Sequence, residues 1–136
     1  MQLIIKNGDL FNSSPPYAHC IAKDYRMGAG IAVPMNKKFS ISSKLKMLDE
    51  IKVGKCYYTK PIFNLITKSK SSGKPTYHTL IASLNSMREI IIKEEIKYLN
   101  IPKIGCGLDR LSWGKVREII TDIFKDVDIT ITVYQK

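Results

Sequence analysis

The densest group of chemically useful side chains lies in residues 101–113, IPKIGCGLDRLSW. An apolar run breaks into a Gly-Cys-Gly turn at 105–107, and Asp109 and Arg110 follow before a helix that Ser112 can cap. A glycine turn between a strand and a helix gathers backbone N–H groups, an arrangement that favours a phosphate or pyrophosphate group. Asp109 beside such a site is either balanced by Arg110 or placed there for proton transfer.

A second glycine turn, MGAGIA at residues 27–32, also separates a predicted strand from a predicted helix. Neither turn is a dinucleotide-binding fingerprint, because Val33 and Arg110 stand where the third glycine belongs. No Walker lysine follows either turn. A single Gly-x-Gly is most often only a tight turn, but two of them between strands and helices favour one phosphate-binding crevice.

The histidines and cysteines do not predict a metal site. His19 and Cys20 are neighbours on a predicted strand and so point to opposite faces, and the chain has no Cys-x-x-Cys. Cys106 has no histidine near it in sequence and is better explained as a small apolar filler than as a nucleophile. Three cysteines, an odd number, predict reduced thiols in an intracellular protein.

Length, composition and charge narrow the function classes. The 136 residues predict one domain, and 44% hydrophobic residues fit a globular protein. No apolar run reaches the roughly 18 residues of a membrane span, and residues 1–6 do not resemble a signal peptide. The net charge of +10 is concentrated in residues 37–75, where ten lysines face Asp49 and Glu50, a balance of +8. Such a segment attracts nucleic acid or a phosphate-bearing ligand, or is simply a solvated surface.

Periodicity predicts alternating strands and helices. The predicted strands are Gln2–Lys6, Tyr17–Ala22, Lys55–Thr59, Ile62–Thr67, Ile101–Ile104 and Asp128–Tyr134. The predicted helices are Pro34–Phe39, a short one from Ser42 to Glu50, Tyr77–Leu99 and Ser112–Phe124. This order predicts a three-layer α/β/α sandwich with a largely parallel or mixed sheet, whose ligand lies at the carboxyl ends of the strands.

Six strings that occur in order carry a resemblance to a known family. They are GDLF (8–11), AHCI (18–21), RMGAGIA (26–32), LITK (65–68), KPTY (74–77) and PKIGCGLDRL (102–111). The chain resembles a macrodomain of the terminal ADP-ribose protein glycohydrolase type, also described as O-acyl-ADP-ribose deacylase. The similarity runs nearly from end to end, which implies a single macrodomain over residues 1–136.

The resemblance implies a catalytic pair. A lysine that matches Lys68 attacks the anomeric carbon of the distal ribose, and an aspartate that matches Asp109 completes the reaction. A free lysine amine is protonated at neutral pH, so a nucleophilic one must be desolvated or crowded by cations. Lys70, Lys74 and Arg110 are candidates for that crowding.

The resemblance also implies the substrate contacts. Asp9 is expected at the adenine amino group with the Leu10 backbone beside it. The remaining expected contacts are His19, Met27, Gly28, Ala29, Gly30, Ile31, Lys103, Ile104, Gly105, Cys106, Gly107 and Leu108. No cofactor and no metal are implied. Ala22 stands where relatives usually have serine, which puts one polar contact to the nucleotide in doubt.

The expected activity is hydrolysis of the bond between ADP-ribose and an acidic side chain, with deacylation of O-acyl-ADP-ribose as related chemistry. The expected partners are ADP-ribosylated proteins or O-acyl-ADP-ribose, with nucleic acid a further possibility through residues 37–75. We expect a monomer in the cytoplasm or nucleus, without membrane association. Two alternatives stay open: a module that binds ADP-ribose without hydrolysing it, and a protein that binds or processes nucleic acid.

Overall fold

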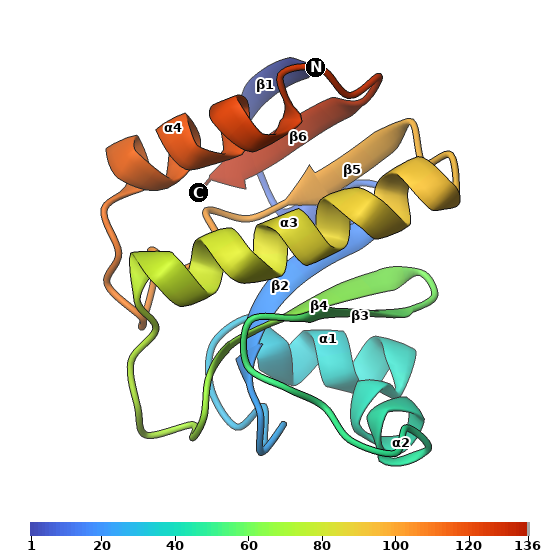
Figure 1. Ribbon diagram of the computed structural model, residues 1–136, viewed down its shortest axis with the longest axis vertical. Helices are drawn as coiled ribbons and strands as arrows, with labels where there is room; N and C mark the ends of the chain where they lie inside the picture. The colour runs from blue at the N-terminus through green and yellow to red at the C-terminus, as the bar shows by residue number, and fades with distance from the viewer. Residues whose placement is uncertain (136) are drawn as a thin grey trace.

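Apolar runs form one sheet, and amphipathic segments cover both of its faces, in the computed structural model, which describes residues 1–135 (Figure 1). The strands are β1 (Gln2–Asn7), β2 (Tyr17–Ala22), β3 (Cys56–Thr59), β4 (Ile62–Lys68), β5 (Tyr98–Ile101) and β6 (Thr130–Gln135). The helices are α1 (Ala32–Phe39), α2 (Ile41–Lys46), α3 (Tyr77–Lys93) and α4 (Trp113–Phe124), with a short 3₁₀ helix η1 (Leu10–Asn12).

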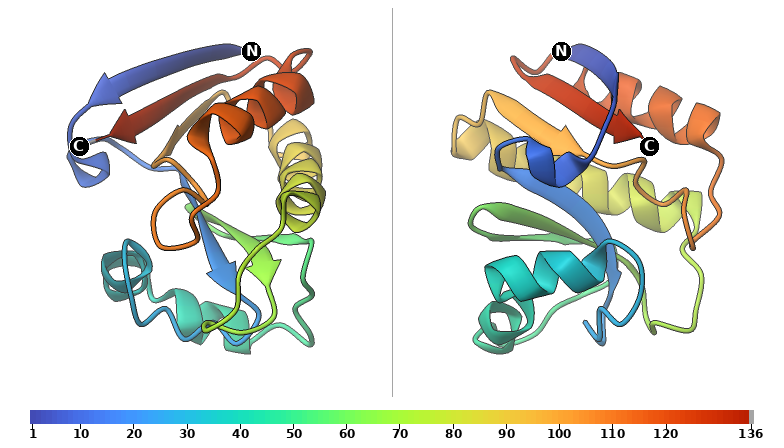
Figure 2. Two further views of the ribbon diagram at one scale, coloured as in Figure 1. Left: turned by 90° about the vertical axis from the view of Figure 1, so that its left-hand side faces the viewer. Right: turned by 180° about the vertical axis from the view of Figure 1, so that it is seen from behind.

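The sheet is mixed, and its strand order is β1-β6-β5-β2-β4-β3. Strand β3 pairs antiparallel with β4, while the other neighbouring strands pair in parallel. Figure 2 shows α3 and α4 on one side of the sheet and α1 and α2 on the other, at its β2–β4 end. The predicted three-layer sandwich is confirmed.

Side chains that point alternately to the two faces of β4 contribute to the core on both sides of the sheet. Phe63 and Leu65 belong to the cluster that packs under α3 and α4, whereas Ile62 and Ile66 belong to the cluster that packs under α1 and α2. Each of these four side chains is fully buried. Residues two apart on a strand share a face, so one seven-residue strand is held by both helical layers. The position of its last residue, Lys68, is therefore firmly fixed.

Two predicted helices are too long, since α2 ends at Lys46 rather than near Glu50, and the strand after the longer helix is misplaced. Helix α3 ends at Lys93 rather than Leu99, and β5 covers Tyr98–Ile101 rather than 101–104. Glu95 adopts a left-handed backbone, φ 54°, and the N–H of Ile96 bonds the Ile91 carbonyl at 3.0 Å, which closes the helix. The prediction was wrong because Ile96 and Leu99 continue the three- and four-residue spacing beyond the true end. Pro102 lacks the N–H that a ladder needs, so the strand stops before it.

A crevice opens between β2 and β5. From β2 the chain reaches the edge strand β3 and returns to β4 on one side of β2. It then crosses by α3 to β5, on the other side of β2. The pairing of β2 with β5 consists of the single register Tyr17–Asn100, near the start of β2, so the strands part towards their carboxyl ends. In open α/β sheets ligands bind at such a switch point. No helix among residues 1–135 is long and apolar enough to cross a membrane.

Candidate active site

A cavity of about 380 Å³ lies over the carboxyl ends of β2, β4 and β5. Its volume is within the range of small-molecule sites. Both glycine turns reach it, the first from the β2–α1 connection and the second from the β5–α4 connection. The residues that line it are His19, Cys20, Ile21, Ala22, Met27, Gly28, Ala29, Gly30, Ile31, Ala32, Lys68, Ser71, Lys74, Pro102, Lys103, Ile104, Gly105, Gly107, Leu108 and Asp109.

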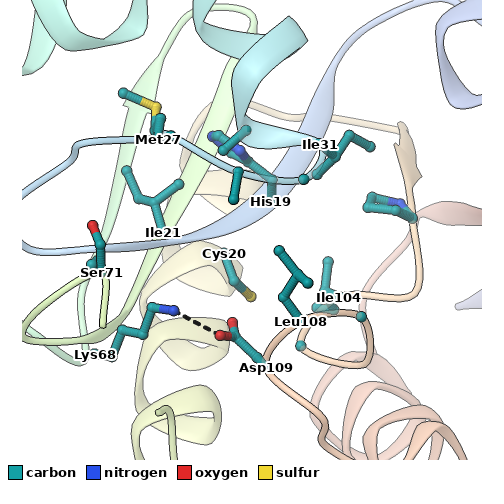
Figure 3. A pocket seen from close by; sticks show the side chains of 18 of the residues that line it. His19, Cys20, Ile21, Met27, Ile31, Lys68, Ser71, Ile104, Leu108 and Asp109 are labelled. Atoms are coloured by element: carbon teal, nitrogen blue, oxygen red, sulfur yellow. Dashed lines mark hydrogen bonds and ion pairs between the residues drawn. The ribbon is translucent and has the colours of Figure 1, made fainter. Parts of the chain in front are cut away.

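Lys68 and Asp109 meet at this cavity although they are 41 positions apart (Figure 3). Lys68 ends β4, Asp109 follows the second glycine turn, and Lys68 Nζ donates to Asp109 Oδ1 at 2.7 Å. Their side chains are only 15% and 13% exposed. A charged pair shielded in this way interacts more strongly than a surface ion pair. The carboxylate is thus partnered by Lys68 and not by its neighbour Arg110, and it lies where it can exchange a proton with the amine.

The first glycine turn delivers the N-terminus of α1 to the cavity. Gly30 has φ +62°, and residues 28–32 line the space that this turn borders. Ile31 stands at the N-cap position, where no side chain caps the helix. The first backbone N–H groups of α1 therefore lack a side-chain acceptor, and a helix N-terminus in that state suits an anion.

The second glycine turn needs glycine at position 105. Gly105 has φ +72°, and an added Cβ would lie 3.0 Å from Leu111 Cδ1. We predict that Gly105→Ala lowers the free energy of unfolding by roughly 1–2 kcal/mol, because an L-residue is strained in the left-handed region. Urea denaturation measures this difference. Gly107→Ala is the matched control, since an added Cβ there meets no atom within 4 Å. Equal losses of unfolding free energy in the two variants would contradict the requirement for glycine at position 105.

His19 borders the cavity but its ring is fully buried, and Nε2 lies 2.7 Å from Asn64 Oδ1. The Asn64 amide nitrogen donates to Thr59 Oγ1 at 2.7 Å and to the Tyr57 carbonyl at 2.9 Å, so its oxygen must be the acceptor for His19. The proton of the neutral ring is therefore on Nε2. Burial lowers the pKa of His19 to about 4, and the hydrogen bond with Asn64 opposes this shift only in part.

Neutral His19 makes stability pH-dependent. The unfolded chain takes up this proton below an ordinary pKa near 6.5, and the folded protein only near 4, so stability present above pH 6.5 is lost as pH falls towards 4. Between pH 7 and pH 5 we predict a loss of about 2 kcal/mol from this ring. Urea unfolding of the wild type and His19→Gln at both pH values isolates the contribution. The same pH dependence in both proteins would refute it.

Two contacts tie the loop after Lys68 to its surroundings. Asp24 accepts hydrogen bonds from the Ser71 hydroxyl at 2.6 Å and from the Ser71 N–H at 2.9 Å. The hydroxyl bond is the main reason that the pKa of Asp24 lies below its ordinary value. Lys74 Nζ donates to the Leu108 carbonyl at 3.0 Å. Sequence reasoning missed Asp24 and Ser71, because a polar loop residue carries no periodic signal.

Three of the expected contacts lie outside the cavity lining. Asp9 caps η1 by accepting from the Phe11 N–H at 3.0 Å, Leu10 is 3% exposed, and Cys106 Sγ contacts the Ile104 carbonyl. The expected contacts that do line the cavity are His19, residues 27–31, residues 103–105, Gly107 and Leu108. Of the three cations expected to crowd Lys68, Lys74 lines the cavity and the other two do not.

The cysteines are free thiols in apolar surroundings. Cys20 points towards the Lys68–Asp109 pair (Figure 3), and its burial raises its pKa far above the ordinary value. Burial also raises the pKa of Cys106, and Lys103 opposes this shift. Thiols held in the neutral form are weak nucleophiles, which argues against a cysteine mechanism. Among residues 1–135 no group of three His, Cys, Asp or Glu side chains could hold a metal ion.

Comparison with known proteins gives the following relationships. No family model matches the chain. The human protein ADP-ribose glycohydrolase OARD1 is 44% identical over 133 residues, which cover 93% of this chain and 87% of that protein. The macrodomain of Mycobacterium tuberculosis DarG superimposes with a TM-score of 0.87 at 20% identity, over 99% of this chain and 98% of that one. Thermosipho africanus DarTG in complex with ADP-ribose superimposes with a TM-score of 0.76 at 22% identity, over 96% of this chain and 41% of that one.

Proposed function

This chain belongs to the macrodomain family, in the branch of the ADP-ribose glycohydrolases, and on that premise we propose how it acts. We propose that this hydrolase removes mono-ADP-ribose from acidic side chains and deacylates O-acyl-ADP-ribose. In this proposal the reaction passes through a covalent bond between Lys68 and the distal ribose, and Asp109 moves the protons. The observation that carries it is the 2.7 Å contact between Lys68 Nζ and Asp109 Oδ1 at the cavity.

The cavity suits the diphosphate and distal ribose. The α1 N-terminus and the two glycine turns present backbone to the cavity from opposite sides, and Gly30 and Leu108 approach each other there. Backbone N–H groups and the positive end of the helix dipole stabilise phosphate charge. A diphosphate bound in this position would leave the distal ribose facing the carboxyl ends of β4 and β5, close to Lys68 and Asp109.

Adenine would lie beyond the cavity, between η1 and α1. Lys38 Nζ of α1 lies 5.3 Å from the centre of the Phe11 ring in η1, so the two elements are neighbours. The carboxylate of Asp9 is oriented by its bond with the Phe11 N–H, and we assign it to the adenine amino group with the Leu10 backbone beside it. A carboxylate acceptor that a bound base covers would reject a base that lacks the amino group.

The chemistry balances with these two side chains. As the Nζ–C1″ bond forms, the C1″–O bond to the acyl group breaks and the acceptor leaves as a carboxylate. Asp109 takes the proton that Lys68 must lose. Water then attacks C1″ as the C1″–Nζ bond breaks. Asp109 returns its proton to the released amine, and the proton that the water loses passes to solvent. A carboxylate is a stable leaving group at neutral pH, so no separate acid is needed to protonate it.

Release of free ADP-ribose from a peptide with mono-ADP-ribosylated glutamate is the direct test. The proposal requires multiple turnovers, whereas a module that only binds would take up ADP-ribose in calorimetry and release none from the peptide. No release from glutamate or aspartate conjugates, or from O-acyl-ADP-ribose, would favour that alternative. We further propose that the protein acts as a monomer inside the cell.

One observation favours a second candidate. The N-terminus of α1 lines the cavity, while its later residues and α2 belong to the basic 37–75 segment with its balance of +8. Nucleic acid bound along this segment would lie near the catalytic pair. Such binding should weaken by orders of magnitude between 50 and 200 mM salt. Binding that is absent at low salt would remove this candidate and leave the hydrolase unaffected.

A further inference from the structure

The loop that carries Asp109 is shaped by its own backbone hydrogen bonds. It joins β5 to α4 and contains a left-handed residue, Arg110, at φ +61°. Within the loop the Leu111 N–H bonds the Gly105 carbonyl at 2.7 Å, and the Arg110 N–H bonds the Gly107 carbonyl at 3.1 Å. These bonds fix the shape of the turn. They do not fix its position relative to β4, where Lys68 lies.

Two contacts link the loop to the β4 side of the site, one from the connection after β4 and one from the first residue of α3. On one side of Asp109, Lys74 Nζ donates to the Leu108 carbonyl at 3.0 Å. On the other side, the Ser112 N–H donates to the Tyr77 hydroxyl at 3.0 Å. The two contacts therefore bracket Asp109 in the sequence.

Tyr77 is itself fixed relative to Lys68. It is the first residue of α3, after the Thr76 cap, whose side chain and that of Thr79 form a capping box. Thr79 Oγ1 also donates to the carbonyl of Thr67, the residue before Lys68, at 2.7 Å. A short hydrogen-bonded path thus runs from the backbone beside Lys68, through the first turn of α3, to the Tyr77 hydroxyl.

The Tyr77 hydroxyl anchors the start of α4. Ser112 occupies the N-cap of α4 but makes no side-chain cap bond, and its N–H joins the helix start to α3. The Tyr77 ring packs against the core and lies under Lys115 Nζ at 5.3 Å. Tyr77 does not line the cavity. Its hydroxyl therefore acts on the site through the Asp109 loop.

We propose that Tyr77 is a positioning residue that holds the Asp109 carboxylate against Lys68. This inference rests on the proposed function, in which Asp109 is the proton carrier. It gives a physical role to Lys74 and Tyr77 of the Lys-Pro-Thr-Tyr string, because both hold the loop that carries Asp109 in position. A displacement of about 1 Å at a reacting group is enough to lower a rate a hundredfold.

Tyr77→Phe keeps the ring and removes only the acceptor. We expect kcat on an ADP-ribosylated glutamate peptide to fall about tenfold, with KM and the Kd for ADP-ribose within twofold. In an Asp109→Asn background, single-turnover rates should show that Tyr77→Phe has less than a twofold further effect. Tyr98→Phe is the matched control, because Tyr98 is 69% exposed at the opposite end of β5 and should leave kcat unchanged.

Each outcome decides a different point. Unchanged kcat in Tyr77→Phe, beside a large loss in Asp109→Asn, overturns the positioning role and leaves the proposed function standing. A tenfold loss in both backgrounds overturns it too, since a general structural effect does not need Asp109. Full turnover in Asp109→Asn overturns the proton-carrier role and this inference with it. If Tyr77→Phe fails to fold, Ser112→Pro removes the donor of the same bond at a φ of −74° that proline adopts, and the same rates decide.

Discussion

Replacing Lys68 by alanine should abolish the release of ADP-ribose, with a loss of at least about 10³-fold in kcat, while the affinity for ADP-ribose stays within a few-fold. Lys68 would supply the electron pair that forms the bond to C1″, and among residues 1–135 it is the lysine that pairs with Asp109. In the proposed function the diphosphate binds to the glycine turns and the α1 N-terminus, which line the cavity and which this substitution leaves unchanged.

Two measurements separate chemistry from binding in this variant. Product release from an ADP-ribosylated glutamate peptide gives the rate, and calorimetry with ADP-ribose gives the affinity. Lys97→Ala is the control, because it removes an exposed lysine that pairs with Asp128 by the far end of β5. Turnover in Lys68→Ala within tenfold of the wild type would exclude a lysine adduct. Loss of both turnover and affinity would mean that Lys68 contributes mainly to binding ADP-ribose.

The parts of the site that follow from periodicity and strand ends could be predicted from sequence. Both glycine turns and Asp109 lie in connections that follow strands, and Lys68 ends a strand. The carboxyl ends of neighbouring parallel strands share one edge of a sheet. The expectation that Lys68 and Asp109 act together came from the resemblance to macrodomains. Spacing alone does not specify which side chains meet across 41 residues.

The missed residues depend on the path of loops. Asp24, Ser71 and Tyr77 act through single hydrogen bonds between segments far apart in sequence, which no local pattern encodes. The same limit explains the overlong helix: a left-handed residue at Glu95 ended α3 although the apolar spacing continued. His19 is a further example of this limit, because its partner Asn64 could not be identified without the register of β2 with β4.

Asp109→Asn should lower turnover by about 10² to 10⁴-fold, the usual contribution of a positioned acid or base. The substitution keeps size and an acceptor oxygen, so the 2.7 Å contact with Lys68 Nζ can persist. An amide cannot take the proton from the amine or return it. The contact would survive while the proton transfer is lost.

Single-turnover rates between pH 6 and pH 9 test this reading of Asp109. Because bulk hydroxide can replace the missing base, the variant should recover part of its rate as pH rises, whereas Lys68→Ala should recover none. Asp126→Asn is the control, since Asp126 pairs with Arg88 at the surface, where an ion pair has little effect on activity. A rate in Asp109→Asn equal to that of the wild type would show that the carboxylate only orients Lys68. A rate that stays low at every pH would place its role after the amine has lost its proton, in the hydrolysis of the adduct.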